Sequence, residues 1–166
     1  MSGKTALLFP GQGSQYVGMG LELAQHFPLA KDLYEHADYV LGVNLSAIAW
    51  HGPAEILNDT INTQPAIFIH SMAVLKLVNH LFPSVTPAAV AGHSMGQLSA
   101  LAAAGTFSFE DGLCLTQIRG ELMKQAGQLF PGGMAAVIGL EIPTIEEICQ
   151  SASQNGDTIE VANDNC

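Results

Sequence analysis

The serine at position 94 is the residue in this sequence that is best placed to act as a nucleophile. It lies in the pentapeptide GHSMG, directly after the apolar run PAAVA and directly before the alanine-rich run QLSALAAA. A sharp turn from a strand into a helix exposes a serine hydroxyl, and it requires small residues on both sides, which Gly92 and Gly96 supply. The start of the helix would stabilise developing negative charge, with the backbone N–H of Met95 as the donor. We therefore predict that Ser94 is a nucleophile, against the alternative that it only caps the helix.

The sequence offers no evident base for this serine. A nucleophilic serine needs a proton acceptor, which is usually a histidine, and no histidine follows Ser94. His93 is its neighbour, and on a tight turn the two side chains should point apart. The five other histidines lie upstream on expected helices or loops, and we interpret them as ordinary core or surface residues. His70 and His80, ten residues apart, would not share a helix face, so they do not indicate a metal site.

Arg119 is the second candidate for chemistry, and it is the only arginine in the chain. It follows Leu115 and Ile118 on the apolar face of an expected helix. The planar guanidinium suits a carboxylate, although the local sequence by itself favours a solvated position at the rim of that face. The glycines of GQGSQ, at 11–15, have neither the lysine of a P-loop nor the third spaced glycine of a dinucleotide site.

The elements that must position these residues alternate between strands and helices. This alternation predicts an α/β fold with a parallel sheet, and the continuous apolar run of PAAVAG is typical of a strand covered on both faces. Hydrophobic spacing and turn residues predict strands at 5–9 and 87–92 and helices at 18–27, 28–41, 64–82, 95–104 and 109–128, with a further helix start near Pro53. Ser108 is the expected N-cap of the last of these helices.

The pattern changes at the sequence FPGG, near Pro131. Beyond it we expect a strand at 134–140, a helix at 143–153 and a strand at 158–163, which together make a βαβ unit. The sequence therefore predicts two domains, at 1–130 and 131–166.

Composition limits the classes of protein to consider. With 48% hydrophobic residues and a net charge of −10, the chain is expected to form a packed core and not to bind nucleic acid, which requires basic residues. The longest apolar stretch is broken by His70, Lys76 and His80, so we expect no membrane span. Three cysteines without metal-ligand spacing indicate reduced thiols in a cytoplasmic protein.

Six motifs in series resemble the malonyl-CoA:acyl carrier protein transacylases and the related acyltransferases of polyketide synthases. The resemblance covers the whole chain in the right order. The motifs are FPGQGSQ at 9–15, NTQPA at 62–66, GHSMG at 92–96, QIRGELM at 117–123, GGMAAVIGL at 132–140 and VANDN at 161–165. The resemblance implies an α/β-hydrolase-like large subdomain with an inserted ferredoxin-like small subdomain. It also implies that this chain is the N-terminal part of a transacylase, with an incomplete large subdomain at 1–130 and only the start of the small subdomain at 131–166.

The same resemblance implies a role for each site residue. Ser94 would accept the malonyl group from malonyl-CoA and pass it to the phosphopantetheine thiol of an acyl carrier protein, in fatty acid or polyketide synthesis. Gln12 and Met95 would supply the oxyanion hole, and Arg119 would pair with the free carboxylate of the malonyl unit. Gln64 and His93 would line the acyl pocket. The resemblance implies no metal and no redox cofactor.

Two departures from the family pattern accompany this resemblance. Gln97 and Leu98 follow GHSMG where the family usually has a glutamate and an aromatic residue, which bears on the polarity of the acyl pocket. The catalytic histidine of the family lies beyond Cys166, so we expect a C-terminal segment or a second chain to supply it and residues 1–166 alone to be inactive.

Two other functions remain open from the sequence. An acyl hydrolase of the same fold would give the acyl group to water, but Arg119 argues against it, because simple acyl groups need no partner for a carboxylate. A non-catalytic fragment that docks a carrier protein would account for the missing histidine. Carrier proteins are acidic, and the scarcity of basic residues in this chain argues against that function.

Overall fold

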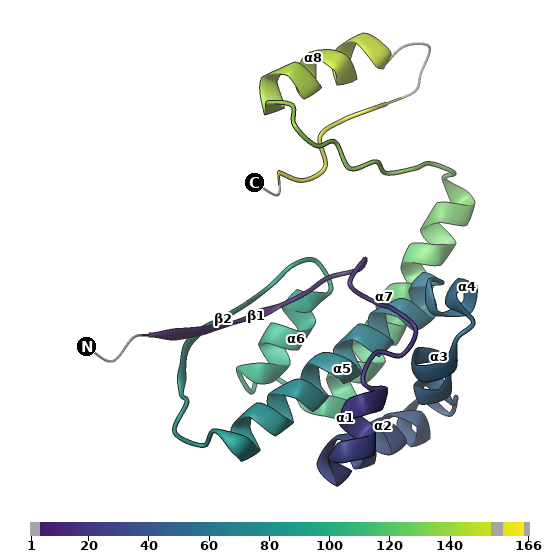
Figure 1. Ribbon diagram of the computed structural model, residues 1–166. Coiled ribbons are helices and arrows are strands. Elements are labelled where there is room, and N and C mark those ends of the chain that lie inside the picture. Colours follow the sequence, from purple (N-terminus) through teal and green to yellow (C-terminus); the bar gives the residue numbers. More distant parts are fainter. Residues whose placement is uncertain (1–3, 154–157, 165–166) are drawn as a thin grey trace. The chain divides into compact units, whose positions relative to one another are not determined.

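The computed structural model describes residues 4–153 and 158–164, which contain two strands and eight helices (Figure 1). In order, the elements are β1 (Thr5–Phe9), α1 (Leu21–His26), α2 (Pro28–Leu41), α3 (Leu45–His51), α4 (Ala54–Leu57), α5 (Thr60–Leu81), β2 (Pro87–Gly92), α6 (Gly96–Ala103), α7 (Phe109–Leu129) and α8 (Ile142–Ala152). The chain divides into two compact units, residues 1–131 and 132–166.

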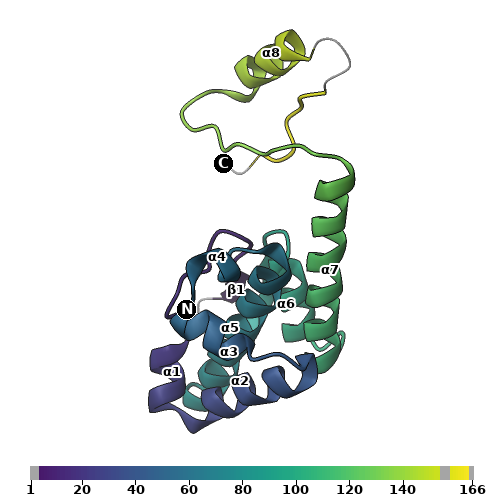
Figure 2. The ribbon, with the colours of Figure 1, turned by 90° about the vertical axis from the view of Figure 1, so that its right-hand side faces the viewer.

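The first unit is built around a parallel pair of strands and one central helix. β1 pairs with β2 in parallel, with Leu7 opposite Val90 and Phe9 opposite Gly92. α6 packs against both strands, and α5 contacts α2, α6 and α7 (Figure 1 and Figure 2). This arrangement of helices with a parallel sheet confirms the predicted α/β class.

α5 supplies more buried core residues than any other element of this unit. Its apolar side chains face several neighbours at once, as the continuous apolar run predicted. The buried residues include Ala66, Ile67, Phe68, Ile69, Met72, Ala73 and Leu77. The helix begins at Thr60, four residues before the predicted start, because the side chain of Asp59 caps it by accepting a hydrogen bond from the N–H of Ile61. Its first turn is polar apart from Ile61, so hydrophobic spacing did not indicate it.

Most of the other predicted elements of the first unit are confirmed. α2 and β2 have the predicted bounds, and the hydroxyl of Ser108 caps α7 by accepting a hydrogen bond from the N–H of Asp111 at 3.0 Å. α1 is shorter than predicted, because Gly18 and Gly20 adopt positive φ angles of 100° and 78° that end the turn before the helix begins.

The prediction that the sheet is covered on both faces is wrong for the described residues. Most side chains of β1 and β2 are exposed, and Leu8 in the middle of β1 is 79% exposed. The apolar composition of a strand indicates that its side chains are suited to burial, whereas their actual burial depends on neighbours from elsewhere in the fold. Two strands and the helices beside them leave much of this surface open.

The second unit contains the predicted helix but not the predicted strands. α8 begins one residue before the expected start, with Pro143 in its first turn. Residues 134–140 and 158–163 form no strand, so the predicted βαβ unit is wrong here. A strand exists only where a neighbour accepts its backbone hydrogen bonds. Instead, the hydroxyl of Ser153 bonds to both the N–H and the carbonyl oxygen of Ile159. The assignment of this unit to a ferredoxin-like subdomain stays a prediction.

Across the described parts of the chain, no helix has both the length and the apolar character that crossing a bilayer requires.

His70 on α5 is expected to make the stability of the first unit depend on pH. Its Nδ1 lies 3.0 Å from the hydroxyl oxygen of Tyr34, which is fully buried. Burial lowers the pKa of His70 below its ordinary value. A neutral imidazole accepts the Tyr34 proton at Nδ1, and protonation of the ring removes that acceptor.

We therefore expect the unfolded chain to bind a proton at position 70 more readily than the folded protein does. The free energy of unfolding should be fully maintained above about pH 6.5, the ordinary histidine pKa, and should fall as the pH drops through the lower pKa of the folded state. The His70→Asn variant should lose this part of the pH dependence. Urea unfolding at about pH 7.5 and about pH 5.5 measures the difference. The same pH dependence in both proteins would contradict the expectation.

Candidate functional site

Ser94 occupies a sharp turn between β2 and α6. Its φ angle is 52°, and it is the one residue other than glycine that has a positive φ in the part of the chain described. The turn is closed by hydrogen bonds from the N–H of Gly96 to the carbonyl oxygen of His93 and from the N–H of Gln97 to that of Ser94. The N-cap of α6 is Met95, and no side chain caps it. The alternative that Ser94 only caps this helix is therefore wrong, and the strained backbone is typical of a functional turn.

Both glycines of GHSMG are required by close contacts, as the sequence predicted. A Cβ atom at Gly92 would collide with the carbonyl oxygen of Gly96, and one at Gly96 would collide with the carbonyl oxygens of Phe9 and Pro10. All of these are backbone atoms, so a side chain at either position would displace the turn that carries Ser94.

We expect Gly96→Ala to destabilise the protein by about 1–3 kcal/mol, because the added methyl group has no space beside the end of β1. Gly127→Ala is the matched control. It lies in α7, where an added Cβ has no heavy atom within 4 Å, so it should stabilise the helix by up to about 1 kcal/mol. Urea unfolding compares the two variants. Equal stability would mean that the turn accommodates a side chain.

Arg119 lies beside Ser94 and Gln64, although the three residues come from separate elements. From α7, the Nη2 of Arg119 donates to Ser94 Oγ at 3.1 Å and its Nη1 donates to Gln64 Oε1 at 2.6 Å. Gln64, on α5, is fully buried, and Arg119 is half-buried. Gly120 lets α7 approach α5, since a Cβ there would lie 2.7 Å from the carbonyl oxygen of Thr60. The solvated rim position that the local sequence favoured for Arg119 is not the one observed.

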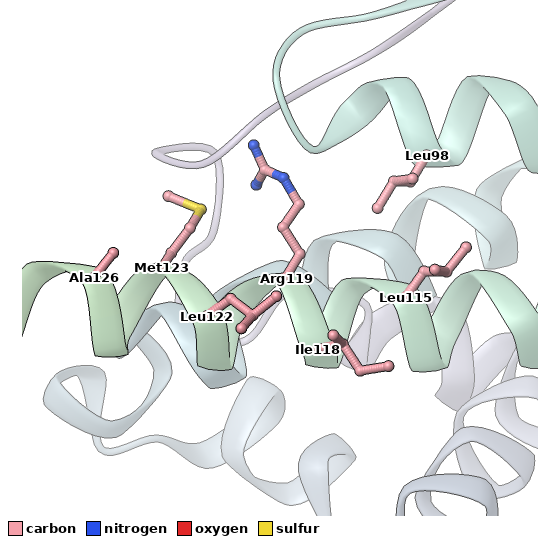
Figure 3. Close-up of a pocket in the computed structure, with 7 residues that line it drawn as sticks. All are labelled: Leu98, Leu115, Ile118, Arg119, Leu122, Met123 and Ala126. Atoms are coloured by element: carbon pink, nitrogen blue, oxygen red, sulfur yellow. The ribbon is translucent and has the colours of Figure 1, made fainter.

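A short apolar groove lies along α6 and α7 beside Arg119 (Figure 3). Its volume is about 420 Å³, and it is lined by Leu98, Leu115, Ile118, Arg119, Leu122, Met123 and Ala126. The guanidinium extends from α7 between Leu98 and Met123 (Figure 3). A cation next to apolar side chains attracts an anion more strongly than one surrounded by water. The surroundings therefore suit a small acyl group that carries a carboxylate.

The other predicted site residues lie close to this cluster or directly beside Ser94. Gln12 is exposed in the loop after β1, and its Oε1 accepts a hydrogen bond from Thr60 Oγ1 at 3.2 Å. His93 is exposed, and its backbone N–H donates to the carbonyl oxygen of Phe9 at 3.0 Å. Within residues 4–153 and 158–164, the backbone N–H groups of Gln12 and Met95 donate no hydrogen bond. These two donors are available to a ligand.

Two further residues, Thr60 and Met123, contact the hydrogen-bonded cluster of Arg119, Ser94 and Gln64, and the sequence did not predict them. Thr60 accepts a hydrogen bond from Gln64 Nε2 at 2.9 Å, and the sulfur of Met123 lies 3.1 Å from the same nitrogen. Thr60 precedes Gln64 by four residues, and this spacing places both on one face of a helix. The spacing was a usable signal, but it depends on a helix that begins before Gln64.

An ion pair holds α7 against the start of α5 near this cluster. Lys124 Nζ pairs with the Asp59 carboxylate, and the hydrogen bond from Lys124 lowers the pKa of Asp59. Asp59 is also the N-cap of α5, so the same side chain fixes the start of one helix and its contact with the other.

Comparison with known proteins places these features in a family. Residues 6–165 match the family model described as an acyl transferase domain. The malonyl CoA-acyl carrier protein transacylase of Bacillus subtilis is 42% identical over 163 residues, which are 98% of this chain and 51% of the relative. The mitochondrial transacylase of Homo sapiens is 40% identical over 164 residues, which are 98% of this chain and 42% of the relative. The chain thus spans about half the length of the curated relatives it matches.

Solved structures agree with these sequence matches. A malonyl-transacylase in complex with a type II PKS acyl-carrier protein has a TM-score of 0.83 at 38% identity, covering 92% of this chain and 49% of that one. An acyl carrier protein S-malonyltransferase from Vibrio cholerae has a TM-score of 0.80 at 42% identity, with 92% and 49% covered. The resemblance indicated by the six sequence motifs is confirmed.

Proposed function

We propose, because this chain belongs to the acyl transferase domain family, that it forms the part of a malonyltransferase that carries the nucleophile. The reaction moves a malonyl group from malonyl-CoA to the phosphopantetheine thiol of an acyl carrier protein, in fatty acid or polyketide synthesis. The observation that carries this proposal is the hydrogen-bonded cluster of Ser94, Arg119 and Gln64. It sets a nucleophile beside the one arginine that suits a carboxylate.

In the first half-reaction, Ser94 Oγ attacks the thioester carbonyl of malonyl-CoA. An oxygen–carbon bond forms, the carbon–sulfur bond breaks, and coenzyme A leaves as a thiol once it has gained a proton. The carbonyl oxygen becomes negative on the way and needs donors that are not already engaged. The backbone N–H groups of Met95 and Gln12 are such donors in the described structure, and Met95 lies at the start of α6.

Arg119 selects the malonyl group through its free carboxylate. Gln64 holds Nη1 while Nη2 reaches Ser94 Oγ. An incoming carboxylate takes up the guanidinium N–H groups that face the nucleophile, since the planar fork binds both oxygens of a carboxylate together. The acyl chain then lies between Arg119 and Ser94, with Gln64 and His93 beside it.

A base outside the described cluster must accept the proton of Ser94. The side-chain partner of Ser94 Oγ is Arg119, which only donates hydrogen bonds and cannot take up a proton. We assign the base to a histidine from polypeptide beyond residue 166 or from a second chain. In the second half-reaction this histidine activates the carrier thiol, which attacks the malonyl-serine ester and restores Ser94.

The reaction needs neither a metal nor a redox cofactor, because acyl transfer through a serine ester involves only bond exchange and proton transfer. We assign it to the cytoplasm, and the free thiols of Cys114 and Cys149 fit a reducing compartment.

The test follows labelled malonyl-CoA with the intact protein and a carrier protein bearing phosphopantetheine. Label should appear on the carrier thiol. Release mainly as free malonate would identify an acyl hydrolase, and carrier binding without acylation of Ser94 would identify a docking module. In the same assay, residues 1–166 alone should be slower by about two to four decades, because they lack the base. An equal rate would place the base within this chain.

A further inference from the structure

Thr60 is hydrogen-bonded to two separate parts of the proposed site. It is the first residue of α5 and is half-buried. Its hydroxyl oxygen accepts a hydrogen bond from Gln64 Nε2 at 2.9 Å, and the same hydroxyl donates to Gln12 Oε1 at 3.2 Å. Gln64 in turn accepts from Arg119. One hydroxyl thus lies between the arginine side and the oxyanion side of the site.

Arg119 determines which group donates and which group accepts along this series of hydrogen bonds. A guanidinium only donates, so the amide of Gln64 must turn its oxygen toward Arg119 and its nitrogen toward Thr60. The Thr60 oxygen then accepts, and its own proton is left for Gln12 Oε1. Turning the Gln64 amide around would place two donors against each other in a fully buried site, which is costly. Each of these hydrogen-bonding groups therefore has one favoured orientation.

The backbone of Thr60 is held in place by contacts at the start of α5. The start of α5 is held by the Asp59 cap, by the ion pair of Asp59 with Lys124, and by Thr63, whose hydroxyl donates to the carbonyl oxygen of Leu57 at 2.6 Å. Gly120 of α7 also contacts the backbone of Thr60 closely. A hydroxyl mounted on a backbone fixed in this way can orient more mobile side chains.

We propose that Thr60 is a positioning residue that orients Arg119, through Gln64, and the Gln12 segment together. The proposal rests on the malonyltransferase function for its kinetic consequences. With Thr60 in place, the guanidinium is directed at the substrate carboxylate while the Gln12 loop is held at the oxyanion. Without its hydroxyl, the Gln64 amide loses the partner that fixes its orientation, and Gln12 loses its link to α5.

The kinetic test compares Thr60→Val, which is of similar shape but lacks the hydroxyl, with Thr60→Ser, which keeps it. In the intact protein, Thr60→Val should lower kcat/KM for malonyl-CoA about tenfold and lower the ratio of malonyl to acetyl transfer, because the hydrogen bonds of this hydroxyl with Gln64 and Gln12 are lost. Thr60→Ser should restore both quantities. Thr116→Val is the control, since it removes a buried hydroxyl on α7 whose hydrogen bond goes to the carbonyl oxygen of Leu113, which is not a site residue. It should reduce stability and leave the malonyl-to-acetyl ratio unchanged.

Failure of the proposed function and failure of this inference give different results. Wild-type protein that transfers no malonyl group would contradict the function. Wild-type transfer with an unchanged ratio in Thr60→Val, or without rescue by Thr60→Ser, would contradict the role of Thr60.

A second readout does not depend on activity. In nitrogen-15 NMR spectra, the side-chain amide of Gln64, assigned by its loss in Gln64→Glu, should be protected from solvent exchange in the wild type and in Thr60→Ser. It should lose that protection in Thr60→Val. Equal protection in all three proteins would show that Thr60 does not hold the amide.

Discussion

Replacing Ser94 with alanine is expected to abolish the malonyl-enzyme. Ser94 combines a positive φ of 52° with a place at the start of α6, and removing the nucleophile of an acyl-transfer site costs several decades of rate. Intact mass measured after incubation with malonyl-CoA should show one added malonyl group on the wild type and none on Ser94→Ala. Transfer to a carrier protein should be lost in parallel.

Ser99→Ala is the matched control for this variant. Ser99 lies in α6, the helix that follows Ser94, and its buried hydroxyl makes no hydrogen bond within the described part of the chain. Its removal should leave acylation unchanged. A malonyl adduct of normal yield on Ser94→Ala, or one lost equally in both variants, would mean that Ser94 is not the nucleophile.

Replacing Arg119 with alanine is expected to shift preference from malonyl toward uncharged acyl groups such as acetyl. The guanidinium contacts both Ser94 and Gln64, so its loss removes the cation where the substrate carboxylate would lie. A hydrogen bond to a charged group contributes roughly 1.5–3 kcal/mol, which predicts a fall of about one to two decades in the malonyl-to-acetyl ratio of kcat/KM.

Arg119→Lys separates charge from geometry. A lysine keeps the positive charge but lacks the planar pair of donors, so it should recover only part of the discrimination. The competing substrates malonyl-CoA and acetyl-CoA, assayed in one mixture, report the ratio directly. An unchanged ratio in Arg119→Ala would mean that Arg119 does not bind the carboxylate and contacts Ser94 for structural reasons only.

The turn around Ser94 could be predicted from the sequence because its determinants are local. A short apolar run, two glycines around the serine and an alanine-rich run predict a strand, a sharp turn and a helix between residues 87 and 104. The structure adds why each glycine is needed, through the carbonyl oxygens that a side chain would meet. The bounds of α2, β2 and the cap of α7 also follow from local signals of spacing and capping.

The contact between Arg119 and Ser94 could not be derived from local patterns. The two residues are 25 positions apart and belong to different elements. Helical spacing assigns Arg119 to the edge of an apolar face, but it cannot say which other element lies opposite. Only the motifs in series, through their resemblance to a family, indicated a role at the site. The start of α5 was missed for a related reason, since capping by Asp59 and a polar first turn leave no hydrophobic period.

The strands predicted at 134–140 and 158–163 are wrong because a strand cannot be predicted from its own residues alone. Their residues have the composition of strands, but a ladder requires a partner, and the described residues form none there. Composition reports a preference for extended backbone, whereas pairing is a property of the assembled sheet.

The most direct test of a Ser94 acyl-enzyme is to trap the intact protein with malonyl-CoA, map the adduct by peptide mass spectrometry, and then add carrier protein. We expect one malonyl group on the peptide that contains Ser94, and its transfer to the phosphopantetheine thiol when the carrier protein is added. An adduct on another residue, or an adduct on Ser94 that passes to water and not to the thiol, would contradict a malonyltransferase that works through this serine.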